Sequence, residues 1–285
     1  MDHTPIAIDT HTHPISGDQQ RYPLRPGRAG SGGWATEMPV STETLLEAMD
    51  RCGVHGAVLV QSANVYGFEN SNIADGAREH PDRCVAICAI DMLAGGAPDT
   101  LTYWVKERGV RGIRVTNAET IDDAAAFPVW QRARDLGIPV DLQLQPPHLA
   151  RVHTVLDRFP DVPVLIDHAG NANKMLRDGT PVPQEPPSTL LALAAYPNVY
   201  LKLTTQNVDG AAAAKEPMST FLQPLVDRFG ARRLMWGTDF PATANERYED
   251  RIAQMRDALS FLSAEDQRWI LGESALQVWP ELRPR

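Results

Sequence analysis

Two histidines, His11 and His13, flank a single threonine directly after the apolar run Ile6-Ala7-Ile8. If this run forms a β-strand, residues two apart point to the same face, so the two imidazoles project side by side. Imidazole nitrogen is a common ligand of zinc and related divalent ions. The pair therefore predicts a site at which two histidines share one metal ion.

Two more groups of suitable chemistry end apolar runs later in the chain. His168 closes the run in "LIDHAG", and Asp239 follows the run in "MWGTDFP". Two or three imidazoles with one carboxylate, and one position left for water, form the ligand set of a catalytic zinc-type centre. We therefore expect His11, His13, His168 and Asp239 to form one site, with Asp239 and His168 as catalytic residues.

Such a site requires elements that bring these four residues together. Seven further apolar runs follow the first, several of them nearly continuous in Val, Ile and Leu, which is typical of strands covered on both faces of a parallel sheet. Helical patterns lie between the runs, and this alternation indicates parallel strands with helical crossovers. The expected strands are residues 6–13, 56–61, 84–90, 110–115, 138–144, 163–168, 199–204 and 233–239.

Eight such units close most simply into a (β/α)8 TIM barrel, an α/β fold. In a closed barrel the first and last strands are neighbours, so Asp239 would approach His13 although 226 positions separate them. Residues 41–53 illustrate the helical pattern, with capping residues at the start and Gly53 at the end. We expect residues 1–285 to form a single barrel domain.

Composition limits the classes of partner. With 285 residues, of which 43% are hydrophobic, the chain can bury a large core. Its formal net charge of −9 argues against binding to nucleic acid or an anionic membrane surface, and no apolar stretch is long enough to span a bilayer. The three cysteines and a start unlike a signal peptide predict a cytoplasmic protein. Assembly into a homo-oligomer stays open as a possibility.

Two long connections rich in Gly and Pro, residues 14–39 and 171–188, leave the expected carboxyl ends of strands one and six. Barrel active sites are built at this end, so both connections are expected to wall the substrate, with plain disordered insertions as the alternative.

The remaining polar residues at strand ends describe an acidic small-molecule substrate. Arg114 offers a guanidinium suited to a carboxylate, and Arg111 differs from it in parity, so both cannot point inward on a regular strand. An exterior salt bridge is the alternative for Arg111. The other expected substrate-binding residues are Ser62, Tyr66, Gln143 and Lys202.

The motifs "DTHTHP", "GVRGIRV", "LIDHAG" and "MWGTDFP" together resemble the amidohydrolase superfamily, in its amidohydrolase-related (amidohydrolase 2) TIM-barrel branch. Within that branch the chain is similar to the group of 2-pyrone-4,6-dicarboxylate lactonases and sugar-acid lactonases. The resemblance implies metal or active-site roles for His11, His13 and His168, and a role for Asp239 as ligand, general base or both. It also implies a divalent metal ion, in the first place Zn²⁺, although some lactonases of the branch work without one.

Two departures from the family bear on the metal count. Gln143 and Gln145 stand on the fifth strand where binuclear members supply histidine, and Arg114 replaces a bridging lysine on the fourth. A two-metal centre is therefore not expected. The predicted activity is hydrolysis of a carboxylated lactone, with Asp239 as the general base. A non-oxidative decarboxylase, a lactone isomerase and a catalytically silent binding barrel stay open as alternatives.

Overall fold

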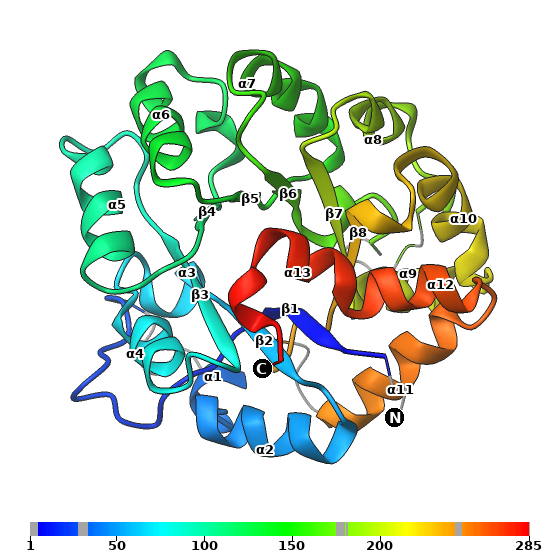
Figure 1. Cartoon of the computed structure of the whole chain (residues 1–285), viewed down its shortest axis with the longest axis horizontal. Helices are drawn as coiled ribbons and strands as arrows, with labels where there is room; N and C mark the ends of the chain where they lie inside the picture. The colour runs from blue at the N-terminus through cyan, green and yellow to red at the C-terminus, as the bar shows by residue number, and fades with distance from the viewer. Residues whose placement is uncertain (1–4, 28–33, 175–179, 181, 243–246, 285) are drawn as a thin grey trace.

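The computed structural model describes residues 5–27, 34–174, 180, 182–242 and 247–284. Within them, eight parallel strands run in the sheet order β1 to β8, with helices around the outside (Figure 1). This architecture confirms the predicted (β/α)8 barrel. The strands are β1 (Ile8–Thr12), β2 (Gly56–Val60), β3 (Cys84–Ala89), β4 (Ile113–Val115), β5 (Val140–Leu142), β6 (Val164–Ile166), β7 (Val199–Thr204) and β8 (Leu234–Gly237).

The helices between the strands bury one apolar face against the barrel. Helix α2 shows why the sequence forms them: the Ser41 side chain accepts a hydrogen bond from the Thr44 amide, and Gly53 ends the helix in the left-handed conformation. The helices before β5 are α1 (Trp34–Glu37), α2 (Thr42–Cys52), α3 (Ala63–Tyr66), α4 (Ser71–Glu79), α5 (Ala97–Lys106) and α6 (Phe127–Leu136). Those that follow are α7 (Val152–Arg158), α8 (Ser188–Ala192), α9 (Thr205–Ala214), α10 (Met218–Phe229), α11 (Tyr248–Leu259), α12 (Ala264–Arg268) and α13 (Ser274–Val278).

The barrel closes between its first and last strands. Thr12 and Phe240 form a parallel bridge just beyond β8. The His13 amide donates to the Phe240 carbonyl at 2.8 Å, and the Asp239 amide donates to the His11 carbonyl at the same distance. These bonds bring the two ends of the sequence into register, as the closure argument predicts.

An irregularity in β1 turns its two histidines toward the barrel interior. The pairing with β2 shifts register between Asp9 and Thr12, which is the signature of a β-bulge. Ile8 packs in the interior cluster, and without the bulge a residue three positions later would point to the opposite face. Because of the bulge, His11 also reaches the interior.

The interior of the barrel is layered. At the end where the strands begin, Ile8, Val58 and Met235 pack against Leu276 and Trp279 of the closing segment. Figure 1 shows α13 lying across this end. Above this apolar layer the inward-facing side chains are charged, and beyond them lies the mouth formed by the strand ends.

The connection after β1 has its own small core. Ile15, Tyr22 and Ala35 pack with Val65 and Tyr66 of α3, so the described part of this connection is anchored. No helix among the described residues is long and apolar enough to cross a membrane.

Candidate active site

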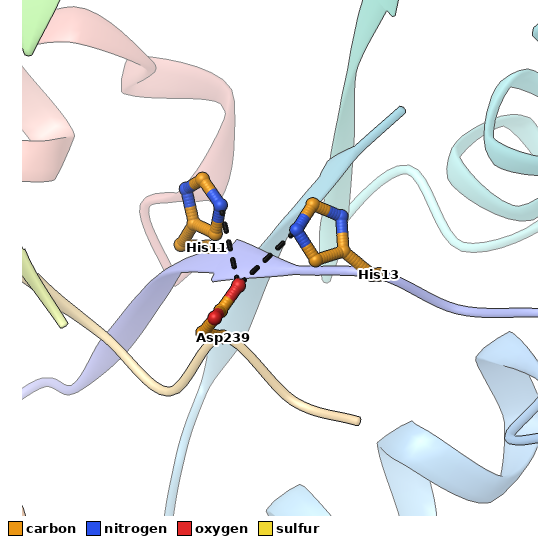
Figure 2. Close-up of side chains that lie close together, drawn as sticks. All are labelled: His11, His13 and Asp239. Carbon is orange, nitrogen blue, oxygen red and sulfur yellow. Dashed lines mark ion pairs between the residues drawn. The ribbon is translucent and has the colours of Figure 1, made fainter. Parts of the chain in front are cut away.

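His11, His13 and Asp239 meet at the closing seam of the barrel (Figure 2). The Nε2 atom of His13 lies 3.3 Å from Oδ1 of Asp239, and the Nε2 atom of His11 lies 3.6 Å from the same oxygen. The two imidazole rings meet edge to face, with centroids 4.8 Å apart. All three side chains are buried. The sequence prediction that the histidine pair and the late carboxylate share one small volume is therefore confirmed.

The backbone fixes the orientation of the His13 ring. Its Nδ1 atom lies 2.7 Å from the Val60 carbonyl at the end of β2. A carbonyl only accepts hydrogen bonds, so Nδ1 carries the proton and Nε2 presents a lone pair in the neutral ring. That lone pair faces a carboxylate oxygen. A proton or a metal cation between the two atoms would relieve their repulsion.

His168 joins the group from β6. Its ring centroid lies 4.8 Å from that of His11, and its Nδ1 atom lies 2.8 Å from the Thr204 hydroxyl. The backbone at His168 is left-handed, with φ 53°, and this conformation continues through Ala169 and Gly170. The Asn207 side chain donates to the His168 carbonyl at 2.9 Å. The strained turn is thus held in place and directs the ring inward.

Asp167 is a central residue that the sequence argument missed. Its Oδ1 atom lies 3.1 Å from Nδ1 of His11, and its Oδ2 atom accepts a hydrogen bond of 2.8 Å from Nε of Arg114. Nζ of Lys202 lies 3.6 Å from Oδ1 of Asp167 and forms a closer ion pair with Asp141. These charged groups are almost fully buried and form the layer directly beneath the histidines.

Burial and neighbouring charges set the ionisation of the cluster. Burial lowers the pKa of His168 to about 4 and the pKa of His11 well below its usual value, so both rings are neutral at pH 7. Burial also favours the neutral form of Asp239, but the contact with His13 and the potential of the histidines outweigh it and lower its pKa. At Asp167, burial is likewise outweighed by His11, Arg114 and Lys202, which lower its pKa well below the usual range.

Gln206 also contacts Asp239 and was absent from the sequence prediction. It stands at the start of α9, directly after β7, and its side-chain nitrogen donates to Oδ2 of Asp239. Oδ1 is thereby left to face the two histidines. The position of Gln206 just past a strand end was the signal that could have identified it.

A cavity of about 550 Å³ opens above these residues. Of the expected substrate-binding residues, Ser62, Arg114 and Gln143 line it, together with His13, His168 and Asp239. It is also lined by Arg25 from the connection after β1 and by Lys174 from the connection after β6. Both long connections thus contribute to its wall.

The structure does not bring two expected residues to this cavity. Lys202 is fully buried beneath it and is occupied by Asp141. Tyr66 is directed elsewhere, with its hydroxyl accepting from the Ser16 amide at 3.0 Å. Arg111 takes the exterior alternative and pairs with Glu281 at 2.9 Å.

The donor atoms fit a metal ion. Ligands about 2.0–2.1 Å from a tetrahedral ion lie about 3.3 Å apart, close to the separations of Asp239 Oδ1 from the two histidine nitrogens. A second group, His11 with Asp167 and His168, also has ligand atoms within 4.8 Å of one another. Nδ1 of His11 and Oδ1 of Asp167 are both buried and lie 3.1 Å apart as an ion pair, but neither atom forms a hydrogen bond of regular geometry with the described residues. The described residues therefore hold a candidate His/Asp metal site with His11 at its centre.

Comparison with known proteins identifies the family. A family model described as amidohydrolase matches residues 8–280, so the chain belongs to this amidohydrolase family, and the resemblance drawn from the motifs is confirmed. The L-fucono-1,5-lactonase of Burkholderia ambifaria is 27% identical over 214 residues, which cover 72% of this chain and 70% of that protein. The 4-sulfomuconolactone hydrolase of Hydrogenophaga intermedia is 27% identical over 283 residues, which cover 93% and 85%.

Solved structures share the fold. A candidate 2-pyrone-4,6-dicarboxylic acid hydrolase from Pseudomonas putida superimposes with a TM-score of 0.76 at 21% identity, covering 99% of this chain and 100% of that one. An amidohydrolase from Burkholderia multivorans, solved with bound zinc, gives a TM-score of 0.73 at 20% identity and covers 96% of this chain and 99% of that one.

Proposed function

We propose that this protein is a lactone hydrolase whose substrate carries an acidic substituent. The observation that carries the proposal is the position of Asp239, which lies against two histidines at the floor of a cavity whose walls bear cationic side chains. Relatives that hydrolyse lactones, as their names state, support it. A carboxylate in this position can accept a proton from water, and an acidic substrate suits the basic walls.

We assign one divalent metal ion, Zn²⁺, to His11, His13 and Asp239. When bound, such an ion polarises the lactone carbonyl and lowers the pKa of water. The donor separations and the lone pair of His13 that faces Asp239 support the assignment. Gln143 and Gln145, which follow β5, argue for one ion rather than two.

The protein's own residues carry the proton and the developing charge. Asp239 accepts a proton from the attacking water, and the hydrogen bond from Gln206 to Oδ2 fixes the orientation of its carboxylate. The hydroxyl of Thr204 can donate to Nδ1 of His168, which leaves Nε2–H as a donor. We assign this donor to the lactone oxygen, where negative charge develops during attack.

Replacement of Asp239 by Asn tests the proposal. Wild-type protein should open acidic lactones in a pH-indicator assay, and D239N should lose turnover while its circular dichroism spectrum stays unchanged. Asp161→Asn, at an exposed carboxylate outside the cavity, is the matched control and should keep full activity. Full activity of D239N would overturn the assignment. Release of carbon dioxide, or formation of an isomeric lactone instead of the ring-opened acid, would replace it by a decarboxylase or an isomerase.

Elemental analysis tests the metal separately. We expect one zinc ion per chain in purified wild-type protein and a loss of zinc from His13→Ala. Metal-free protein with chelator-resistant activity would overturn the zinc assignment and leave lactone hydrolysis standing, with the same four residues acting directly on water and substrate. We further propose a cytoplasmic location, because the three cysteines are free thiols.

A further inference from the structure

Arg114, the cation expected to bind the substrate's carboxylate, is already engaged by the protein. Its Nε atom donates to Asp167, and its Nη1 atom donates to the Gln61 carbonyl at 3.3 Å. Only 4% of the residue is exposed. Its positive charge is largely offset by Asp167, so a carboxylate would gain little by approaching it.

Two other cations line the same cavity. Arg25 and Lys174 are exposed, and neither forms an ion pair with another residue in the described part of the chain. Among the described residues that line the cavity, Asp239 is the single carboxylate, whereas Arg25, Arg114 and Lys174 are cations. In a protein with a net charge of −9, a cavity with this excess of positive charge is a local feature that attracts anions.

The chain that carries Arg25 is anchored. The Arg25 amide donates to the Val65 carbonyl at 2.9 Å. Three residues earlier, Tyr22 is buried and donates its hydroxyl to Asp75 of α4 at 3.0 Å. The guanidinium therefore extends from a fixed point of the wall.

The chain that carries Lys174 is anchored as well. Asn171 donates to the Leu144 carbonyl at 2.6 Å. The side chain of fully buried Asn173 donates to the backbone carbonyl of Asn207 and accepts from the Asn207 side chain, both at 2.8 Å. Lys174 also contributes to the depressed pKa of His168, as expected of a cation near that ring. Lys174 thus follows an anchored stretch of chain and lines the same cavity as His168 and Asp239.

We propose that Arg25 and Lys174 are the specificity-determining residues that bind the acidic substituent of the substrate, in place of Arg114. This inference rests on the proposed lactone hydrolysis. The connections that follow β1 and β6 hold the acidic substituent through these two cations. The lactone carbonyl is thereby directed toward Asp239 and His168. Neutral lactones lack this interaction, so the two cations select for acids.

Turnover measurements test whether the two cations select acidic lactones. The variants are Arg25→Gln, Lys174→Gln and the double variant. The substrates are γ-carboxy-γ-butyrolactone and its neutral methyl ester. A hydrogen-bonded charge contact contributes about a factor of 10 or more, so kcat/KM for the acid should fall about 10-fold in each single variant and about 100-fold in the double variant. The fall in kcat/KM for the acid should come from a higher KM, and kcat/KM for the ester should stay unchanged. Lys106→Gln, at an exposed lysine of α5, is the control.

Binding provides a second readout that needs no turnover. In isothermal titration calorimetry, glutarate should bind the wild-type protein and bind the double variant about 100-fold more weakly, whereas dimethyl glutarate should bind both equally. Arg25→Lys should retain most of the affinity because it keeps the charge. Equal losses on acid and ester, or glutarate binding unaffected by the variants or absent from the wild type, would overturn the inference. Charge-dependent glutarate binding without lactone turnover would support the acid site and refute the hydrolase.

Discussion

Oδ1 of Asp167 lies 3.1 Å from Nδ1 of His11, in the fully buried centre of the barrel. The carboxylate comes from the end of β6 and the imidazole from β1, strands that are not neighbours. Such a contact fixes the ring so that its other nitrogen, Nε2, faces Asp239. Asp167 is therefore a positioning residue for His11.

Replacement of Asp167 by Asn should weaken the site without removing it. Loss of an orienting carboxylate behind a ligating histidine typically costs about 10–100-fold in metal affinity or activity. We expect kcat of D167N to fall by about this factor with KM little changed, and zinc affinity to fall in parallel in a competition assay. The Asp161→Asn control should behave as wild type, and an unchanged zinc affinity in D167N would contradict the orienting role.

Lys202 should be a stability determinant rather than a substrate ligand. Lys202→Met leaves Asp141 without its buried cation, and breaking a buried pair costs about 3–5 kcal/mol in the free energy of unfolding, measured with urea. The double variant Asp141→Leu/Lys202→Met removes both charges and should recover part of this loss. If Lys202→Met raised KM and left stability unchanged, Lys202 would instead be a substrate-binding residue.

Gly237 should be required for closure of the barrel. A Cβ atom at this position would lie 2.6 Å from Cβ of His11 and 2.9 Å from its amide nitrogen, both closer than real contacts allow. Gly237→Ala should therefore force β1 and β8 apart, with a loss of about 1–3 kcal/mol in stability and a fall in activity. Gly95→Ala, where a Cβ would meet open space, is the control. Equal thermal midpoints for the two variants would refute the tight seam.

The cysteines should differ in reactivity toward a disulfide reagent. Burial raises the pKa of Cys84 and Cys88 to about 12, whereas Cys52 is only half-buried. The thiolate is the reactive form, so at pH 8 only Cys52 should be modified in the folded protein. The other two thiols should react after addition of denaturant. Rapid modification of all three in the native state would mean that the barrel opens more readily than its packing indicates.

The sequence predicted the barrel because buried parallel strands leave an unambiguous signal. Apolar runs, several of them nearly continuous in Val, Ile and Leu, located all eight strands, although β4, β5 and β6 are shorter than their runs. Closure then placed Asp239 beside His13 without any local signal joining them. The strand ends themselves could not be read, because apolar residues continue into the turns that follow.

Strand parity failed where the backbone departs from a strand. Asp167 and His168 are consecutive and would point to opposite faces of a regular strand. Only His168 was predicted to belong to the site. The left-handed turn at His168 allows both to reach His11. The depth of a side chain along its strand could not be predicted either. Lys202 faces inward, but it lies below the cavity, where Asp141 neutralises its charge.

The seam between β1 and β8 also constrains when the protein can become active during synthesis. The ribosome releases the chain from its N-terminal end, so the histidine pair emerges before the carboxylate that completes the centre. The ribosome must add 226 residues after His13 to reach Asp239. A nascent chain halted before β8 would have its imidazoles without their acidic partner, and translation must pass that strand before any turnover can begin.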